Sequence, residues 1–160
     1  LEYTPEKVEG KTLIFKTSNG TEAIARAHNA KEILIGSFLN MSTVVEALRT
    51  REREIVLICA GWRGRLALED MLCAGQIVYE LNDGKLPEEA KDGAKIAFSI
   101  YEKYADSIEE AIHASNHAVR LRDEVNGEDV AYSCKVDSIN ILPVLEDRII
   151  QLRHGQKANK

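Results

Sequence analysis

The sequence predicts an α/β fold with three layers: a mostly parallel sheet in the first half, a helical middle and a β-rich C-terminal end. Three apolar runs in the first half lack polar alternation and are separated by helical patterns. Such runs are typical of parallel strands that helices cover on both faces. Consecutive helical patterns and then two β-type runs follow in the second half.

Each of the three apolar runs leads into a predicted helix. TLIFKTS (12–18) precedes the helical pattern EAIARAH, and EILIGSF (32–38) precedes NMSTVVEALRTR, in which apolar side chains share one face. EIVLICAG (54–61) precedes a helix expected from about 66 to 81. NDG (82–84) should end that helix, because Asn and Gly tolerate the left-handed conformation needed there.

The second half is expected to be helical first and β-rich at its end. Helices are predicted between 86 and 125, with Pro87 and Ser115 as starting residues for two of them.

The C-terminal end is expected to turn and then form strands. NGED (126–129) is a turn signal, and VAYSCKVD (130–137) and INILPVLEDRIIQL (139–152) have β character. Pro143 suits a strand start or an edge strand, because proline cannot donate to a central ladder.

Composition excludes several classes of protein. The 160 residues fit one domain, expected over 1–155, with a polar tail at 156–160. A net charge of −5 argues against nucleic-acid binding, which needs a basic surface. No apolar run approaches the about 20 residues that span a membrane, and no signal-peptide pattern opens the sequence. Three cysteines without a CxxC pair favour a reducing, cytoplasmic setting.

Three loops hold the residues that suit ligand binding: TSNGT (17–21), GSFLN (36–40) and CAGWRGR (59–65). Ligands of open α/β sheets bind beyond the carboxyl ends of strands, where loops enter helix N-termini of partial positive charge. Arg63 and Arg65 add guanidinium groups that suit phosphate, carboxylate or sulfonate. We therefore expect a pocket for a small anion.

Purely structural explanations remain open for these residues. Asn-Gly is a turn signal by itself, Ser37 and Asn40 can cap a helix, and the two arginines can be solvated loop charges. Glu69 and Asp70 fit a first helical turn, where acids are favourable without any function. Adjacent helical residues point about 100° apart, so these two carboxylates cannot both face one site squarely.

Cysteine and histidine chemistry gives further alternatives. Five residues separate Cys59 from Arg65, as in cysteine-dependent phosphatases, although Leu66 stands where those enzymes commonly have Ser or Thr. A buried, inert thiol is the structural explanation. His113 and His117 have metal-ligand spacing, but a surface pair is the simpler interpretation. A cysteine-dependent phosphatase and a non-catalytic module that binds small organic anions therefore both stay open.

The motifs FKTSNGTEAI, GSFLN and CAGWRGRLALEDMLCAGQIV resemble the 2-phosphosulfolactate phosphatase family of coenzyme M biosynthesis. SNHAVRL, GEDVAYSCKVDS and ILPVLEDRII resemble its C-terminal half, so the resemblance covers nearly the whole chain. It implies a Mg²⁺-dependent phosphatase that hydrolyses 2-phosphosulfolactate to sulfolactate and phosphate. It also implies that roughly the first third of the family's chain, with an Asp-hydrophobic-Leu-Arg-Ala-Thr-like motif, lies outside this sequence.

The resemblance also implies roles for individual residues. Glu69 and Asp70 are the expected metal ligands and, with Arg63 and Arg65, the expected catalytic residues. Contacts with a substrate that carries phosphate, carboxylate and sulfonate are expected from loop residues: Thr17, Ser18, Asn19, Gly20, Thr21, Ser37, Asn40, Cys59 and Gly61. A homodimer is a further expectation, because exposed sheet edges need covering.

Overall fold

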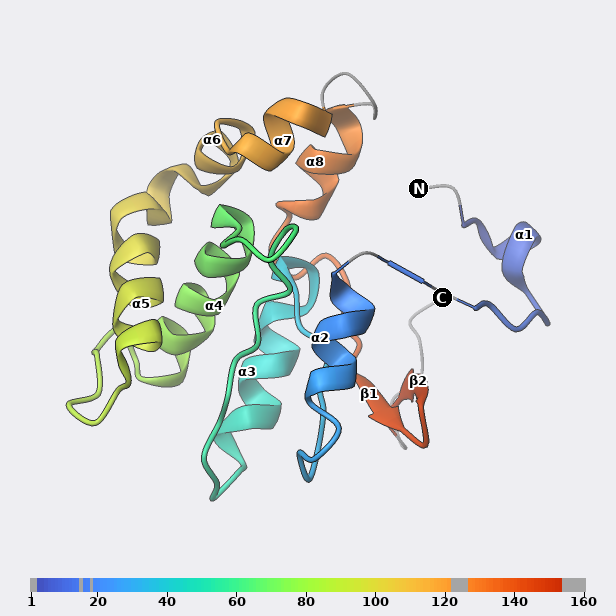
Figure 1. Cartoon of the computed structure of the whole chain (residues 1–160), viewed down its shortest axis with the longest axis horizontal. Helices are drawn as coiled ribbons and strands as arrows, with labels where there is room; N and C mark the ends of the chain where they lie inside the picture. Colours follow the sequence, from blue (N-terminus) through green and yellow to red (C-terminus); the bar gives the residue numbers. More distant parts are fainter. Residues whose placement is uncertain (1–2, 15, 18, 122–126, 154–160) are drawn as a thin grey trace.

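The computed structural model describes residues 3–14, 16–17, 19–121 and 127–153. These residues form a mixed helix-and-strand structure in which helices predominate (Figure 1). The helices are α1 Pro5–Val8, α2 Gly20–Arg26, α3 Met41–Arg49, α4 Leu68–Leu81, α5 Asp92–Tyr104, α6 Ile108–His113, α7 Asn116–Leu121 and α8 Gly127–Ser133, with the 3₁₀ turns η1 Phe38–Asn40 and η2 Ala105–Ser107. The strands are β1 Pro143–Glu146 and β2 Ile149–Leu152. Within these described ranges, no helix has the length and apolar character that crossing a membrane requires.

Helix α4 lies at the centre of the core, between α3 and α5 (Figure 1). Its Leu72 and the first residue of α3, Met41, are fully buried and belong to one apolar cluster with side chains from α6 and β1. The contact with α5 is very close, because a Cβ atom on Gly75 would overlap the carbonyl oxygen of Ala97. Only glycine lets these two helices pack at this distance.

Most predicted helix ends agree with the structure. Helix α4 ends at Leu81, and Asp83 and Gly84 then adopt φ of 50° and 75°, as the NDG signal predicts. Ser115 precedes α7, and its Oγ accepts a hydrogen bond from the Ala118 amide at 3.1 Å.

The prediction that Pro87 starts a helix is wrong. Residues 87–90 form one isolated turn, closed by the Ala90 amide donating to the Pro87 carbonyl, and α5 begins only at Asp92. Glu88 and Glu89 are exposed and give this turn no apolar face to bury.

The predicted strand at 130–137 is also wrong, because its first residues belong to helix α8. Val130 and Cys134 both pack against the main apolar cluster, and a spacing of four places them on one helical face. This packing overrides the β propensity of the segment. Residues 127–129 of the predicted NGED turn lie in α8, and Asn126 lies outside the described residues.

The sheet differs from the predicted one. Strands β1 and β2 form an antiparallel hairpin that begins at Pro143, as the C-terminal pattern predicts. The run 32–36 joins it through a bridge between Leu34 and Val144. In the part of the chain that the structure describes, 12–17 and 54–60 pair with neither each other nor 32–36, so the mostly parallel sheet is not shown. Composition marks strands locally, whereas pairing depends on neighbours that are distant in sequence.

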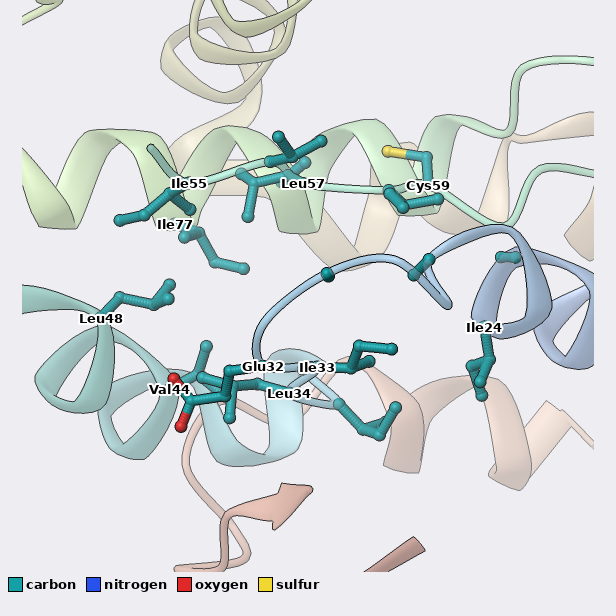
Figure 2. Close-up of a pocket in the computed structure, with 18 of the residues that line it drawn as sticks. Ile24, Glu32, Ile33, Leu34, Val44, Leu48, Ile55, Leu57, Cys59 and Ile77 are labelled. Atoms are coloured by element: carbon teal, nitrogen blue, oxygen red, sulfur yellow. The ribbon is translucent and has the colours of Figure 1, made fainter. Parts of the chain in front are cut away.

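The unpaired run 54–60 borders a large cavity. Figure 2 shows Ile55, Leu57 and Cys59 along one side of this cavity and Glu32, Ile33 and Leu34 along the other. Its volume is about 720 Å³, and side chains of α2, α3 and α4 also line it.

Candidate active site

The loop that follows 54–60 is a tight turn that projects two arginines. Trp62 and Arg65 exchange backbone hydrogen bonds, each amide donating to the other carbonyl at 2.9 Å. Between them, Arg63 and Gly64 have φ of 50° and 72°, as in the primed turns of hairpins. Both arginines are exposed. A non-glycine residue with left-handed φ costs about 1 kcal/mol or more, so Arg63 is strained at the tip of the loop.

Asp70 joins this loop to the first turn of α4. Its Oδ2 accepts a hydrogen bond from the Gly61 amide at 2.6 Å. Gly61 has φ of 68°, and a Cβ atom there would lie 2.6 Å from the Arg65 carbonyl oxygen. Burial raises the pKa of the Asp70 carboxyl, and the Gly61 hydrogen bond opposes that shift. Asp70 therefore positions the arginine loop and places a partly buried carboxyl at its base.

Glu69 pairs with a histidine from α7. The Nδ1 atom of His117 lies 2.6 Å from Oε1 of Glu69, and the Trp62 ring stacks on the imidazole with centroids 5.7 Å apart. The guanidinium carbon of Arg63 lies 5.1 Å from the Trp62 ring centroid. Oε2 of Glu69 is buried and has no hydrogen-bond partner in the described part of the chain.

Sequence reasoning missed the pairing of His117 with Glu69. The spacing of four residues suggests a pair of His113 with His117, but the two residues lie on different helices, and His113 faces Glu109 at 3.6 Å within α6. His117 and Glu69 are 48 positions apart, so no local spacing indicates their contact. The Ser115 cap, which separates α6 from α7, was the only available signal that the two histidines diverge.

Glu69 and Asp70 face different cavities, as their adjacency on a helix predicts. Asp70 lines the 720 Å³ cavity, whereas Glu69 lines a second cavity of about 310 Å³ together with Arg65 and His117. No cluster of three or more His, Cys, Asp or Glu that suits a metal occurs among the residues the structure describes. The two carboxylates therefore serve two different places.

The structure brings the first predicted loop to the third. The Arg63 amide donates to Oδ1 of Asn19 at 3.2 Å. Thr17 caps the start of α2, because its Oγ1 accepts from the Thr21 amide at 3.2 Å and its carbonyl accepts from the Thr21 hydroxyl at 2.9 Å. Gly20 is the first residue of α2. Ser18 lies outside the described residues.

The second loop uses its polar groups internally. Ser37 and Asn40 form a capping box, and the buried Asn40 amide group donates to the carbonyls of Ile35 and Ile141, each at 3.1 Å. The N-terminus of α3 is occupied by Asp137, whose Oδ1 accepts from the Ser42 amide at 2.7 Å. The capping explanation that the sequence left open is thus observed here.

Cys59 is an exposed residue, but the surroundings of its thiol disfavour the thiolate. Burial raises its pKa, and the charge of Asp70 raises it further. The thiol donates to the Asp70 carbonyl at 3.6 Å. A nucleophilic cysteine needs a lowered pKa, so these surroundings count against a thiolate mechanism.

The junction of the arginine loop with α4 thus joins two guanidinium groups, two acids and a histidine, and arginines and carboxylates are groups that phosphoryl-transfer sites commonly use. The family model described as 2-phosphosulpholactate phosphatase matches residues 1–148, and the chain belongs to this family.

Individual relatives agree with the family match. A probable 2-phosphosulfolactate phosphatase of Caldanaerobacter subterraneus subsp. tengcongensis is 34% identical over 151 residues, which are 94% of this chain and 62% of the relative. Relatives of the same name from Thermotoga petrophila and Thermotoga maritima are each 39% identical over 153 residues, which are 96% of this chain and 65% of each relative. The chain therefore spans a little less than two-thirds of the length of these relatives.

Proposed function

We propose that this chain carries the arginine loop and metal-binding helix of a Mg²⁺-dependent phosphatase that hydrolyses 2-phosphosulfolactate to sulfolactate and inorganic phosphate. Membership of the family and the names of the relatives support this substrate. The observation that carries the proposal is the junction itself, where Asp70 holds the loop of Arg63 and Arg65 at the first turn of α4. This arrangement presents positive charge beside a carboxylate that can bind a cation.

Charge neutralisation is the main task of such a site. Phosphoryl transfer needs positioning and electrostatic stabilisation more than covalent chemistry. Arg65 lines the smaller cavity with Glu69, and its guanidinium suits a phosphate oxygen pair. Arg63 and the Asn19 loop, which the 3.2 Å hydrogen bond joins, are proposed to bind the carboxylate or sulfonate end.

Glu69 fits the role of a Mg²⁺ ligand better than Asp70. Its Oε2 is a buried oxygen without a partner among the described residues, while His117 holds Oε1. Mg²⁺ commonly takes only one or two protein carboxylates and completes its shell with water and substrate oxygens. When bound, the ion would polarise the phosphoryl group. Asp70 would then act as a positioning residue for Gly61 and the arginine loop.

The proposal includes a cytoplasmic location, a role in coenzyme M biosynthesis and a homodimer. Three free cysteines at Cys59, Cys73 and Cys134 support a reducing compartment. The exposed strand β2, in which Ile149 and Ile150 are 63% and 51% exposed, supports a second copy that covers it.

The test is phosphate release from 2-phosphosulfolactate with Mg²⁺ and with EDTA. It compares this chain, a longer chain that restores the full length of the relatives, and the Glu69→Gln variant of the active form. We expect EDTA to abolish release and Glu69→Gln to reduce it about 100-fold or more. Glu88→Gln, on the exposed turn before α5, is the matched control and should have no effect.

Two outcomes would contradict the proposal. Phosphate release that continues in EDTA would show that the reaction does not require a metal ion. Stabilisation of every form by 2-phosphosulfolactate, without phosphate release from any, would instead indicate the non-catalytic binding module.

A further inference from the structure

The run 54–60 is an apolar extended segment whose backbone is unpaired. Within the described ranges, none of its amides or carbonyls takes part in a backbone hydrogen bond. Ile55, Val56 and Ile58 are 38%, 70% and 50% exposed. An extended apolar segment with free edges is an open template for another strand.

The run 32–36 has one paired edge and one free edge. The Ile35 amide donates to Pro143 and the Ile33 carbonyl accepts from Leu145, both at 3.0 Å. Backbone groups alternate between the two edges of a strand, so the amide and carbonyl of Leu34 point to the edge opposite β1. No backbone hydrogen bond to Leu34 is found in the part of the chain that the structure describes.

The 720 Å³ cavity lies between these two free edges, and we call it the strand groove (Figure 2). Its walls are the runs 32–36 and 54–60, and apolar side chains of three helices line it: Ala23 and Ile24 of α2, Val44 and Leu48 of α3, and Ala74 and Ile77 of α4. A strand in this groove would meet apolar side chains from all three helices. Parallel strands buried on both faces are continuously apolar.

We propose that the strand groove binds one apolar β-strand, supplied by the part of the family's chain that has no counterpart in these 160 residues. The relatives provide the necessary length, because this chain spans only 62% to 65% of them. The strand would pair with 32–36 on one side and 54–60 on the other. Since one helix separates these two runs along the chain, they are expected to run in the same direction.

The chain's own run 12–17 does not fill the groove. Leu13 is 43% exposed and Ile14 is 95% exposed, and none of the residues that line the groove precedes Gly20. Figure 1 shows the described residues of this run extending from α2 towards α1, away from the helical core.

The groove also ends at the candidate active site. Gly20, Cys59 and Asp70 line it together with the apolar residues. A strand parallel to 54–60 would therefore end beside the arginine loop, where strands of α/β sheets present ligand-binding residues. The strand is inferred from the unpaired backbone edges of 32–36 and 54–60, so the inference does not depend on the proposed reaction.

The experiment is hydrogen exchange of backbone amides. It compares this chain with a chimera in which the unmatched part of the Thermotoga maritima relative is joined to it in the relative's own order. We expect the alternate amides of 55–58 that face the groove to exchange freely in this chain and at least about 100-fold more slowly in the chimera. The Leu72 amide in α4 reports folding and should be protected equally in both.

Two proline variants of the chimera provide a second measurement. Val56→Pro and Leu57→Pro remove neighbouring amides that face opposite edges of the segment. The variant that removes a groove-facing amide should lose the protection in the chimera and the other should keep it, while both leave Leu72 protected in this chain.

Four results would overturn the proposal. Equal exchange of 55–58 in this chain and the chimera excludes a strand from the added part. Protection already present in this chain at every concentration assigns the groove to its own run 12–17. Protection that increases with concentration assigns it to a second copy. Protection of 55–58 in the chimera that persists in both Val56→Pro and Leu57→Pro excludes backbone pairing of this segment with the added strand.

Discussion

His117 holds Glu69 by a 2.6 Å contact between Nδ1 and Oε1, and the stacked Trp62 ring fixes the imidazole from the side of the arginine loop. This pair joins α7 to the first turn of α4, and no local sequence pattern connects these two elements. Oε2 of Glu69 has no hydrogen-bond partner among the described residues and is the oxygen that we propose for the cation. In that proposed site, His117 would orient Glu69.

Replacing His117 should weaken metal binding more than it weakens folding. Loss of a partner that orients a metal ligand typically costs about 10- to 100-fold in metal affinity or activity. We expect His117→Ala to show this loss in the Mg²⁺ concentration needed for half-maximal activity and in Mg²⁺ binding by calorimetry. His117→Asn should restore part of it, because its amide can donate to Oε1.

His113→Asn is the matched control, since His113 faces Glu109 within α6. Equal loss in both histidine variants, or unchanged Mg²⁺ binding in His117→Ala, would show that His117 has only a structural role.

Gly75 should tolerate no side chain. Gly75→Ala would place a methyl group against the Ala97 carbonyl and the Tyr101 Cβ, and overpacking of this kind costs about 1 to 3 kcal/mol or more. Gly93→Ala in α5 is the control, because a Cβ atom there meets nothing within 4 Å and alanine favours helices by about 0.5 to 1 kcal/mol. Urea unfolding should therefore shift in opposite directions, and similar midpoints for both variants would refute the close packing of α4 and α5.

Arg63 is expected to lower the stability of the fold while its guanidinium contributes to substrate binding. Arg63→Asn introduces a residue that tolerates the left-handed conformation, so it should raise the free energy of unfolding by up to about 1 kcal/mol. The same change removes a guanidinium, so we expect the KM for 2-phosphosulfolactate to rise about 10-fold or more, as for loss of a charge-assisted contact of 1.5 kcal/mol or more. Unfolding in urea and steady-state kinetics measure the two effects. A variant that is more stable and fully active would show that Arg63 contributes nothing to the reaction.

Glu32 gives the fold a defined pH dependence. Its carboxylate accepts from Nε and Nη2 of Arg51 at 2.7 and 2.8 Å, and these hydrogen bonds lower its pKa from the ordinary value of 4.5. The stabilisation is therefore present above pH 4.5 and is lost as the pH falls through the lowered pKa. We expect Glu32→Gln to cost about 0.5 to 1 kcal/mol at pH 7, a figure reduced for its partial exposure, and almost nothing near pH 2.

Urea unfolding at the two pH values measures this difference. Glu22→Gln is the control, because its pair with Arg26 is exposed and worth only about 0.3 to 0.5 kcal/mol. A pH-independent loss in Glu32→Gln would contradict an electrostatic origin.

The sequence predicted those parts of the molecule that depend on local chemistry. Capping by Ser115, the left-handed end of α4 and the hairpin from Pro143 all follow from residue types at fixed short spacings. The meeting of the arginine loop with Asn19 agrees with part of the expected convergence of three loops, whereas the second loop uses its polar groups internally. The contact between His117 and Glu69 depends on how α7 packs, which no local pattern encodes.

Strand pairing is a second feature that local sequence patterns do not encode. The runs 32–36 and 54–60 have strand composition, but a strand pairs only where a neighbour lies beside it. The apolar composition of 54–60 therefore predicts a partner strand, and the structure shows the groove that such a partner would fill.

The last prediction separates two phosphatase mechanisms. Burial and Asp70 raise the pKa of Cys59, and burial raises that of Cys73 to about 12, so neither thiol is a thiolate at neutral pH. Cys59→Ser should keep activity within about threefold, and iodoacetamide should react slowly with Cys59 at pH 7, because the thiolate is the reactive form. A cysteine-dependent phosphatase would instead lose all activity in Cys59→Ser and retain it in EDTA. Slow alkylation of Cys59 and loss of activity in EDTA would be independent results, and together they would support Glu69, and not Cys59, as the residue at the centre of the reaction.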